Sequence, residues 1–428
     1  MAKGRKIRLV INETDPVPLV KDFDTFVSYL AENQPYLTKK KQFLPPKVVY
    51  HINHLMSKPN KENTPRTGQE LYPLLHLFYY LVFYGKLFKK VFEGSQKIKM
   101  QKIDRIKEYL HLTPPEKYFF LLETFWVDCD WNKLGVRVRV EYIIWRVTSV
   151  LKFIAKRNPG ETISPKELDE REFPTFPMFD DFFMLYLSFF GFFKLTRDEK
   201  LYKEFQLKKY FPISSLTPSL LGVTLAPILC KERPLEKWNL SFRQKIEGKI
   251  LSFPGLELNQ QNEKRYVPFF KAFTDFFQEG ELQKTLSRKP RKLSRGTFIF
   301  KVSVGKGIWR KIAISGECTL EDLHVAIQDA FHFDFDHLYA FFMDGEPWSY
   351  DAIYALGCEE GPYVDEIRIG EMELSVGEQF LYLFDFGDEW DFEVRLVEIK
   401  KEYPKPSKPK VVESKGEAPE QYPYMEDE

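Results

Sequence analysis

Four carboxylates crowd around one short turn near the end of this 428-residue chain. They are Asp385, Asp388, Glu389 and Asp391. Gly387 and Asp388 are expected to form the turn of a β-hairpin, because both residue types tolerate positive φ. Carboxylates this close repel one another unless an arginine, a lysine or a metal ion lies among them, or one keeps its proton. The turn therefore predicts either a structural ion-pair site or a functional site.

Two histidines and one arginine give this turn two competing interpretations. In the functional one, the side chains of His324, His337, Asp385 and Asp388 converge on a divalent metal such as zinc, manganese or iron, and a bound water becomes a nucleophile. In the structural one, Arg310 pairs with Asp385 or Asp388, and both histidines form hydrogen bonds at the rim of the core. Because nothing in the spacing makes these side chains converge, we expect no cofactor and keep the divalent metal as the alternative. The candidate polar cluster is Arg310, His324, His337, Asp385, Asp388 and Trp390, with no catalytic residue assigned.

The elements that must position this cluster form an α+β module over residues 297–402. Aromatic residues alternate along both arms of the hairpin, which predicts one strongly aromatic face. Two strands are expected at 297–304 and 308–314, then a helix capped by Thr319 with Asp322 at its third position. A strand over 337–343 and a short strand over 366–372 complete a β-grasp-like ββαβ order. After residue 402 the composition turns to Pro, Lys and Glu, so a tail over 403–428 is expected to be disordered.

Several separated motifs of this module resemble the plasmid pRiA4b Orf-three-like family. They are Trp309-Arg310-Lys311-Ile312, the helix pattern from Leu320 to Phe331, His337-Leu338-Tyr339-x-Phe341, Asp385-Phe386-Gly387-Asp388-x-Trp390 and the tail residues from Gly416 to Tyr422. The resemblance covers roughly residues 297–425. It implies an association with plasmids and other mobile elements, and it brings no established enzymatic activity.

The charge of the chain is divided unevenly, although the net charge is only +1. Residues 1–157 carry 28 basic and 15 acidic side chains, and residues 158–296 carry 23 and 18. Residues 297–428 carry 12 basic and 29 acidic side chains. The balances are +13, +5 and −17, so the N-terminal part could meet phosphates and the C-terminal part could not. Alternatively, the two parts attract each other within the chain or in a dimer.

The N-terminal part shows one pattern twice: an apolar helix, a glycine, a hairpin and a Leu-Thr-Pro sequence. The first copy ends its helix at Gly85 and starts the next at Thr113, where Pro114 and Glu116 complete an N-cap. The second copy runs from Gly191 to Thr217, with strands expected over 192–195 and 205–207. The pattern predicts two winged-helix-like units, 1–157 and 158–283.

Lysines gather on the first of these hairpins. They are Lys86, Lys89, Lys90, Lys97 and Lys99. Lysines on the wing of a winged helix grip phosphate without reading bases, so these five are the candidate nucleic-acid-binding residues. Winged helices also bind proteins, and lysines on an exposed hairpin also serve only to solvate it, so both alternatives stay open.

Other classes of protein receive no support from the sequence. The four cysteines are far apart and form no C-x-x-C pair, which fits a reducing cytoplasm. Neither a secretory signal nor an apolar run of roughly 20 residues is present, so we expect no membrane partner. Asp385-Phe386-Gly387 lacks the other kinase motifs, and no phosphate-binding glycine loop occurs.

These observations predict a cytoplasmic, mainly helical N-terminal region, a basic linker over 284–296 and the C-terminal module. The function that fits them is a non-enzymatic accessory or regulatory protein of a mobile element whose basic region binds nucleic acid or a protein partner. A metal-dependent hydrolase built on the His/Asp set and a protein-interaction scaffold are the alternatives.

Overall fold

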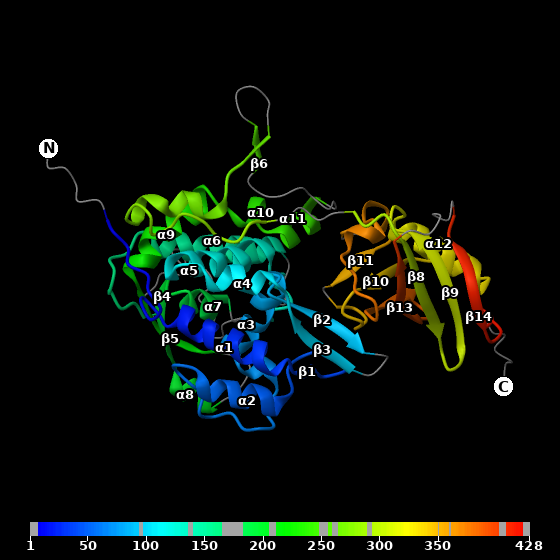
Figure 1. Ribbon diagram of the computed structural model, residues 1–428, viewed down its shortest axis with the longest axis horizontal. Coiled ribbons are helices and arrows are strands. Elements are labelled where there is room, and N and C mark those ends of the chain that lie inside the picture. The colour runs from blue at the N-terminus through cyan, green and yellow to red at the C-terminus, as the bar shows by residue number, and fades with distance from the viewer. Residues whose placement is uncertain are drawn as a thin grey trace. The chain divides into compact units, whose positions relative to one another are not determined.

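The computed structural model of the chain describes residues 7–93, 97–135, 140–164, 183–204, 211–247, 256–258, 264–288, 293–349, 351–358, 361–401 and 408–422. The chain divides into two units, whose elements are labelled in Figure 1. The first comprises Met1–Lys90, Ile98–Phe242 and Ser252–Arg288. The second comprises Val91–Lys97, Arg243–Leu251 and Lys289–Glu428. The main division falls between Arg288 and Lys289, within the segment 284–296.

Up to Arg288 the described chain is mainly helical, as the apolar spacing predicts. The α-helices are α1 (Leu19–Asn33), α2 (Pro46–Leu55), α3 (Pro73–Tyr84), α4 (Arg105–Leu110), α5 (Pro114–Glu123), α6 (Val140–Ile154), α7 (Phe183–Phe189), α8 (Glu199–Glu204), α9 (Leu220–Lys231), α10 (Leu235–Trp238) and α11 (Leu240–Glu247). The strands are β1 (Tyr36–Leu37), β2 (Phe88–Glu93), β3 (Lys97–Lys102), β4 (Phe193–Arg197), β5 (Ile213–Pro218), β6 (Leu256–Leu258) and β7 (Lys264–Tyr266). Three irregular helical segments are η1 (Gln69–Leu71), the π-helical η2 (Thr124–Asp128) and η4 (Phe269–Phe276).

The core of the first unit forms around α3, whose side chains are apolar on most sides. Phe78 is fully buried and lies edge-on to Phe23 of α1, with ring centroids 5.2 Å apart. Helices from both sides of residue 157 share this core, since α3 contacts α7 and α6 contacts α9. The helix predicted after Thr113 is present as α5, with the predicted capping box: the Thr113 hydroxyl accepts from the Glu116 amide, and the Glu116 carboxylate accepts from the Thr113 amide.

The second copy of the repeat differs from the prediction. Glu199–Glu204 forms the helix α8 where a polar turn was expected, and the predicted strand 205–207 lies outside the described residues. Strand β4 instead pairs with β5, which contains the second Leu-Thr-Pro sequence. That sequence therefore ends a strand, and the next helix starts later because the Ser219 hydroxyl caps α9 by accepting from the Gly222 amide. The winged-helix assignment is not confirmed.

The second unit contains one antiparallel sheet of seven strands and the helix α12 (Leu320–Phe331). The strands are β8 (Thr297–Val304), β9 (Ile308–Ser315), β10 (Tyr339–Phe342), β11 (Ala352–Tyr354), β12 (Gln379–Phe384), β13 (Trp390–Lys400) and β14 (Lys410–Lys415), in the spatial order β11-β10-β12-β13-β8-β9-β14. The predicted ββαβ order is present as β8, β9, α12 and β10, and the predicted Thr319–Asp322 capping box starts α12. A β-grasp topology is not confirmed, because every neighbouring pair of strands in this sheet is antiparallel.

The aromatic hairpin of β12 and β13 supplies much of the core under α12. Phe380, Tyr382 and Phe384 point to the helix side, while Leu381 and Leu383 belong to a smaller cluster on the other face. The two faces follow from the period-two alternation of the strand. Phe386 joins the smaller cluster and lies 5.0 Å from Trp348, measured between ring centroids.

Two predicted features of the second unit differ in the structure. The expected short strand over 366–372 is replaced by two 3-10 turns, η5 (Val364–Glu366) and η6 (Ile369–Glu371). The tail predicted to be disordered over 403–428 contains β14, which pairs with β9, and the buried Gln421. A free sheet edge offers backbone hydrogen bonds that make up for the low apolar content of this segment. Among the described residues, none of the helices combines the length and apolar character that crossing a bilayer requires.

The start of the predicted linker is bound tightly to the first unit. Arg288 donates from Nε to Glu123 at 2.9 Å and also pairs with Asp128, and its side chain is only 10% exposed. The Thr285 hydroxyl donates to the other Glu123 oxygen at 2.9 Å. Burial raises the pKa of Glu123, and the Arg288 guanidinium opposes that rise. A charge pair this deeply buried matters mainly because neither charge can be left alone.

We expect Arg288→Ala to lower the free energy of unfolding by about 3–5 kcal/mol, because it leaves the Glu123 charge buried without its partner. Lys107→Ala is the matched control, since Lys107 pairs with Asp104 at the surface, and such pairs contribute about 0–1 kcal/mol. Urea titrations of both variants measure the difference. Equal losses in the two variants would contradict this account of the buried pair.

Candidate functional site

The turn between β12 and β13 is built by Asp385. Its backbone is left-handed, with φ 57°, and its carboxylate accepts hydrogen bonds from the amides of Gly387 at 2.9 Å and Asp388 at 3.3 Å. Aspartate tolerates this conformation because its short side chain bonds to the following amides. The predicted Gly387-Asp388 turn is therefore wrong in detail: the positive φ angles belong to Asp385 and Glu389.

The four turn carboxylates do not form one cluster. The side chain of Asp385 is 10% exposed, whereas Asp388 is exposed to solvent. Glu389 accepts a hydrogen bond from the indole of Trp348 at 3.0 Å. Burial and the neighbouring Glu389 raise the pKa of Asp391, which lines the opposite face of the sheet. The repulsion that the sequence suggested therefore persists between Glu389 and Asp391.

His337 is the histidine that reaches the turn. Its Nε2 lies 3.4 Å from the Asp385 carboxylate, 3.6 Å from that of Asp336 and 3.0 Å from the hydroxyl of Tyr422. The Tyr422 hydroxyl donates to Asp336 at 2.7 Å, which lowers the pKa of Asp336 and raises that of Tyr422 to about 12. Gln421 holds this tail in place by accepting from the amide of Asp334 at 2.5 Å. These partners are not predicted from the sequence, although the tail motif contains Gln421 and Tyr422.

His324 lies in a separate, buried network on α12. Its Nδ1 is 2.6 Å from the hydroxyl of Tyr382, which also accepts from the Gln328 amide at 2.6 Å. The His324 ring stacks on Tyr339, with centroids 3.6 Å apart and an angle of 8° between the planes. Burial lowers the pKa of His324 to about 3, so the imidazole is neutral at ordinary pH. His324 and His337 share only an aromatic neighbour, Phe384, with ring centroids 6.2 and 6.0 Å away.

Arg310 does not pair with the turn carboxylates, contrary to the structural interpretation of the sequence. Its Nε donates to the Ala330 carbonyl at 3.0 Å, in the last turn of α12, and its Nη1 donates to the carbonyls of Trp309, Lys415 and Gly416 at 3.0 to 3.1 Å. The negative end of the helix dipole and its unpaired carbonyls explain this preference. Arg310 therefore fastens the tail to the helix.

Trp390 also lies apart from the turn carboxylates. Its ring is 4.9 Å from Phe333, and its buried indole nitrogen has no hydrogen-bond partner among the described residues. Of the predicted cluster, the structure thus brings together the side chains of His337 and Asp385, and the Asp388 backbone amide bonds to Asp385. In the part of the chain that the structure describes, no three His, Cys, Asp or Glu residues are arranged to hold a metal ion.

The basic hairpin joins β1 to form a three-stranded sheet in the order β1-β3-β2. Tyr36 pairs with Lys99, and Leu37 pairs with Ile98. Leu37, Phe88, Ile98 and Met100 are buried on one side of this sheet. The solvent side of the sheet holds Glu93 at the end of β2, Lys97 at the start of β3, and Tyr36, Lys89, Lys99 and Gln101. We call the last four residues the lysine face.

The five predicted lysines of this hairpin have different surroundings. Lys89 and Lys99 belong to the lysine face, Lys86 is exposed at the turn before β2, and Lys97 is exposed at the start of β3. Lys90 differs, because its ammonium donates to the Gln42 side chain at 2.8 Å and lies 5.4 Å from the Phe83 ring. Lys90 therefore supports the hairpin from its inner side.

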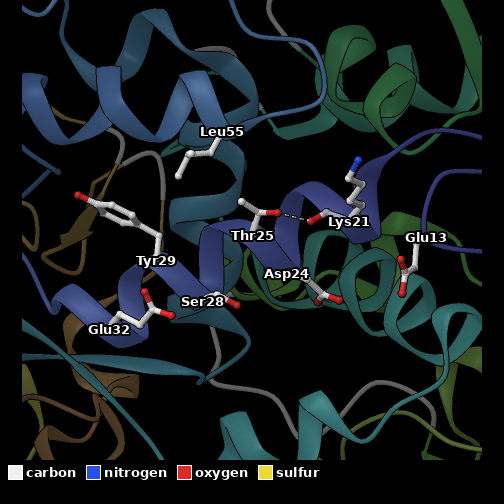
Figure 2. A pocket seen from close by; sticks show the side chains of 8 residues that line it. All are labelled: Glu13, Lys21, Asp24, Thr25, Ser28, Tyr29, Glu32 and Leu55. Atoms are coloured by element: carbon white, nitrogen blue, oxygen red, sulfur yellow. Dashed lines mark hydrogen bonds between the residues drawn. The ribbon is translucent and has the colours of Figure 1, made fainter.

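A hollow of about 480 Å³ opens beside α1 and is drawn in Figure 2. It is lined by Glu13, Lys21, Asp24, Thr25, Ser28, Tyr29, Glu32 and Leu55. The Asp24 carboxylate already accepts from the hydroxyl of Tyr109 at 2.6 Å and from Lys117 at 2.7 Å. Thr25 donates to the backbone carbonyl of Lys21. Asp24 therefore ties α1 to α4 and α5, and Thr25 bonds within α1.

The C-terminal module can be compared with known families now that its geometry is described. Residues 300–422 match the family model of the plasmid pRiA4b ORF-3-like protein. The C-terminal module, residues 300–422, belongs to that family. The resemblance predicted from the motifs is confirmed, and the match extends over the tail residues that contact Asp336 and His337.

A solved structure of a protein of unknown function, MM3350 from Methanosarcina mazei Go1, is 30% identical to this chain. The match covers 29% of this chain and 71% of that one, with a TM-score of 0.25. Among curated proteins no match was found.

We expect His324 to make the pRiA4b ORF-3-like module sensitive to acid. Its pKa in the folded state, about 3, lies below the ordinary value of 6.5, so the unfolded chain takes up a proton that the folded chain refuses. The stability from this group is complete above pH 6.5 and is lost as the pH falls toward 3. Between pH 7 and pH 5, the wild type should lose about 2 kcal/mol more than His324→Gln. Unfolding titrations at both pH values measure this, with the exposed His332→Asn as control, and equal losses in wild type and His324→Gln would refute it.

We expect Asp385 to act through the turn geometry and not through its charge. Asp385→Ala should lower the free energy of unfolding by about 1–3 kcal/mol, since alanine cannot accept from the two amides and disfavours positive φ. Asp385→Asn should remain close to the wild type, because the amide oxygen accepts the same bonds. Thermal unfolding of both variants, with Asp388→Ala as the exposed control, makes the comparison. A loss in Asp385→Asn as large as that in Asp385→Ala would mean that the charge itself is needed.

Proposed function

We propose that this chain is a non-enzymatic accessory or regulatory protein that binds nucleic acid through the lysine face of its β1-β3-β2 sheet. The observation that carries the proposal is the arrangement of Lys89 and Lys99 on one solvent-facing side, above a buried side formed by Leu37, Ile98 and Met100. Because the sheet is anchored from below, the lysines are displayed without any role in the core.

The distribution of charge supports a polyanionic partner at this end of the chain. Residues 1–296 have a balance of +18, and residues 297–428 have a balance of −17. Phosphates are attracted by the first and repelled by the second. On this proposal the acidic pRiA4b ORF-3-like module does not contact the phosphates.

The polar groups of that module support a binding protein over a hydrolase. His324 is neutral and bonded to Tyr382, while the Asp385 carboxylate accepts two backbone amides. A general base or a nucleophile-activating group needs a free lone pair directed at its substrate. His324 Nδ1 and Asp385 Oδ1 are both engaged within the fold, and His337 is held between Asp385 and Tyr422.

Binding should fall steeply with salt, because phosphate contacts release counterions. Each phosphate contact contributes about 0.7–0.9 to the steepness of log affinity against log salt. The double variant Lys89→Gln/Lys99→Gln, which loses two contacts, should therefore make that slope shallower by about 1.5. Fluorescence anisotropy with labelled DNA over a range of salt concentrations measures the slope. Lys194→Gln is the matched control, since Lys194 is also an exposed strand lysine but lies on β4. No binding at low salt, or binding independent of salt, would overturn the proposal.

A further inference from the structure

The lysine face contains an aromatic ring that the hydrophobic effect does not explain. Tyr36 is 44% exposed, although its neighbour Leu37 is buried. The Lys99 ammonium lies 6.0 Å from the centre of the Tyr36 ring, and the two residues are partners in the strand register. The ring is therefore presented to solvent next to a positive charge.

The position of this ring is fixed by the backbone on both sides of it. Just before Tyr36, the Pro35 carbonyl accepts from the Met100 amide at 3.1 Å. Just after β1, the Thr38 amide donates to the Phe43 carbonyl at 2.7 Å. A ring held this way loses little conformational freedom when something stacks on it.

We infer that the nucleic acid bound at the lysine face is single-stranded, with one base stacked on Tyr36 and the adjacent phosphates on Lys99 and Lys89. This inference rests on the proposed function and adds its substrate class. The bases of a duplex are stacked on one another and offer no face to an external ring, whereas unpaired bases do. Lysines alone would serve either form, so the exposed ring decides between them.

Gln101 supports the same assignment by its place on this face. It is exposed and has the same orientation as Lys99 on β3, since residues two apart share a side of a strand. Its amide can donate to and accept from the edge of an unpaired base. An acidic peptide would need the lysines but neither the ring nor this amide.

The test compares labelled oligothymidylate with a duplex of the same length, at one low salt concentration, using the full chain. Tyr36→Leu removes the aromatic ring but keeps an apolar side chain suited to a strand, and Tyr36→Phe keeps the ring. Tyr142→Ala is the control, because Tyr142 is an exposed tyrosine on α6. Circular dichroism of each variant verifies that it is folded.

We expect Tyr36→Leu to weaken oligothymidylate binding by about 5- to 100-fold, the range for loss of one stacked base. Tyr36→Phe and Tyr142→Ala should bind like the wild type, and duplex binding should be weaker than oligothymidylate binding and unchanged by Tyr36→Leu. Wild-type affinity in Tyr36→Leu, together with a loss in Lys99→Gln, would overturn the single-strand inference and leave the proposed function intact. Absence of binding to either nucleic acid, or binding to an acidic peptide in their place, would overturn both.

Discussion

The second unit depends on the burial of one aromatic sheet face under α12. Because side chains alternate along β12, burying Phe380 and Phe384 also buries Tyr382 between them. A phenolic hydroxyl buried in an apolar core needs a hydrogen-bond partner, because burying it without one costs more free energy than a typical hydrogen bond contributes to stability. His324 and Gln328, one helical turn apart on α12, supply that partner from the facing side. The polar residues on the inner side of the helix thus follow from a single hydroxyl.

The same constraint separates the two histidines, which the sequence predicted to be members of one polar cluster. His324 is taken into the core by Tyr382, whereas His337 comes just before β10, where the chain emerges at the rim. There it contacts Asp385 and the tail residue Tyr422. The tail is held at its other end by Arg310, whose guanidinium bonds to the carbonyls of Lys415 and Gly416. The polar motifs of the module are better explained as contacts that hold its last segment in place than as a reaction centre.

Local signals in the sequence were enough for some elements and not for others. The capping boxes at Thr113 and Thr319 and the aromatic hairpin were predicted correctly, because each is determined within a few residues. The second Leu-Thr-Pro sequence is identical to the first but forms a strand, since pairing with β4 overrides local preference. The sequence predicts a carboxylate partner for Arg310 because opposite charges attract, yet its partners are backbone carbonyls of α12, β9 and the tail, which no sequence pattern marks. The composition of the tail predicts disorder, because composition carries no information about the free sheet edge with which β14 pairs.

In the lysine face, the structure adds a residue to a group of lysines that the sequence already shows. Five lysines near one hairpin were visible, but Tyr36 is about 50 positions earlier in the chain and joins them only through β1. A cross-strand pair such as Tyr36 and Lys99 contributes roughly 0.2–1 kcal/mol, and burying the ring would contribute more. That pairing energy does not account for an aromatic ring that is 44% exposed on a small sheet whose other side is mostly apolar. Recognition would account for it, because a base stacked on Tyr36 would cover the exposed surface of the ring.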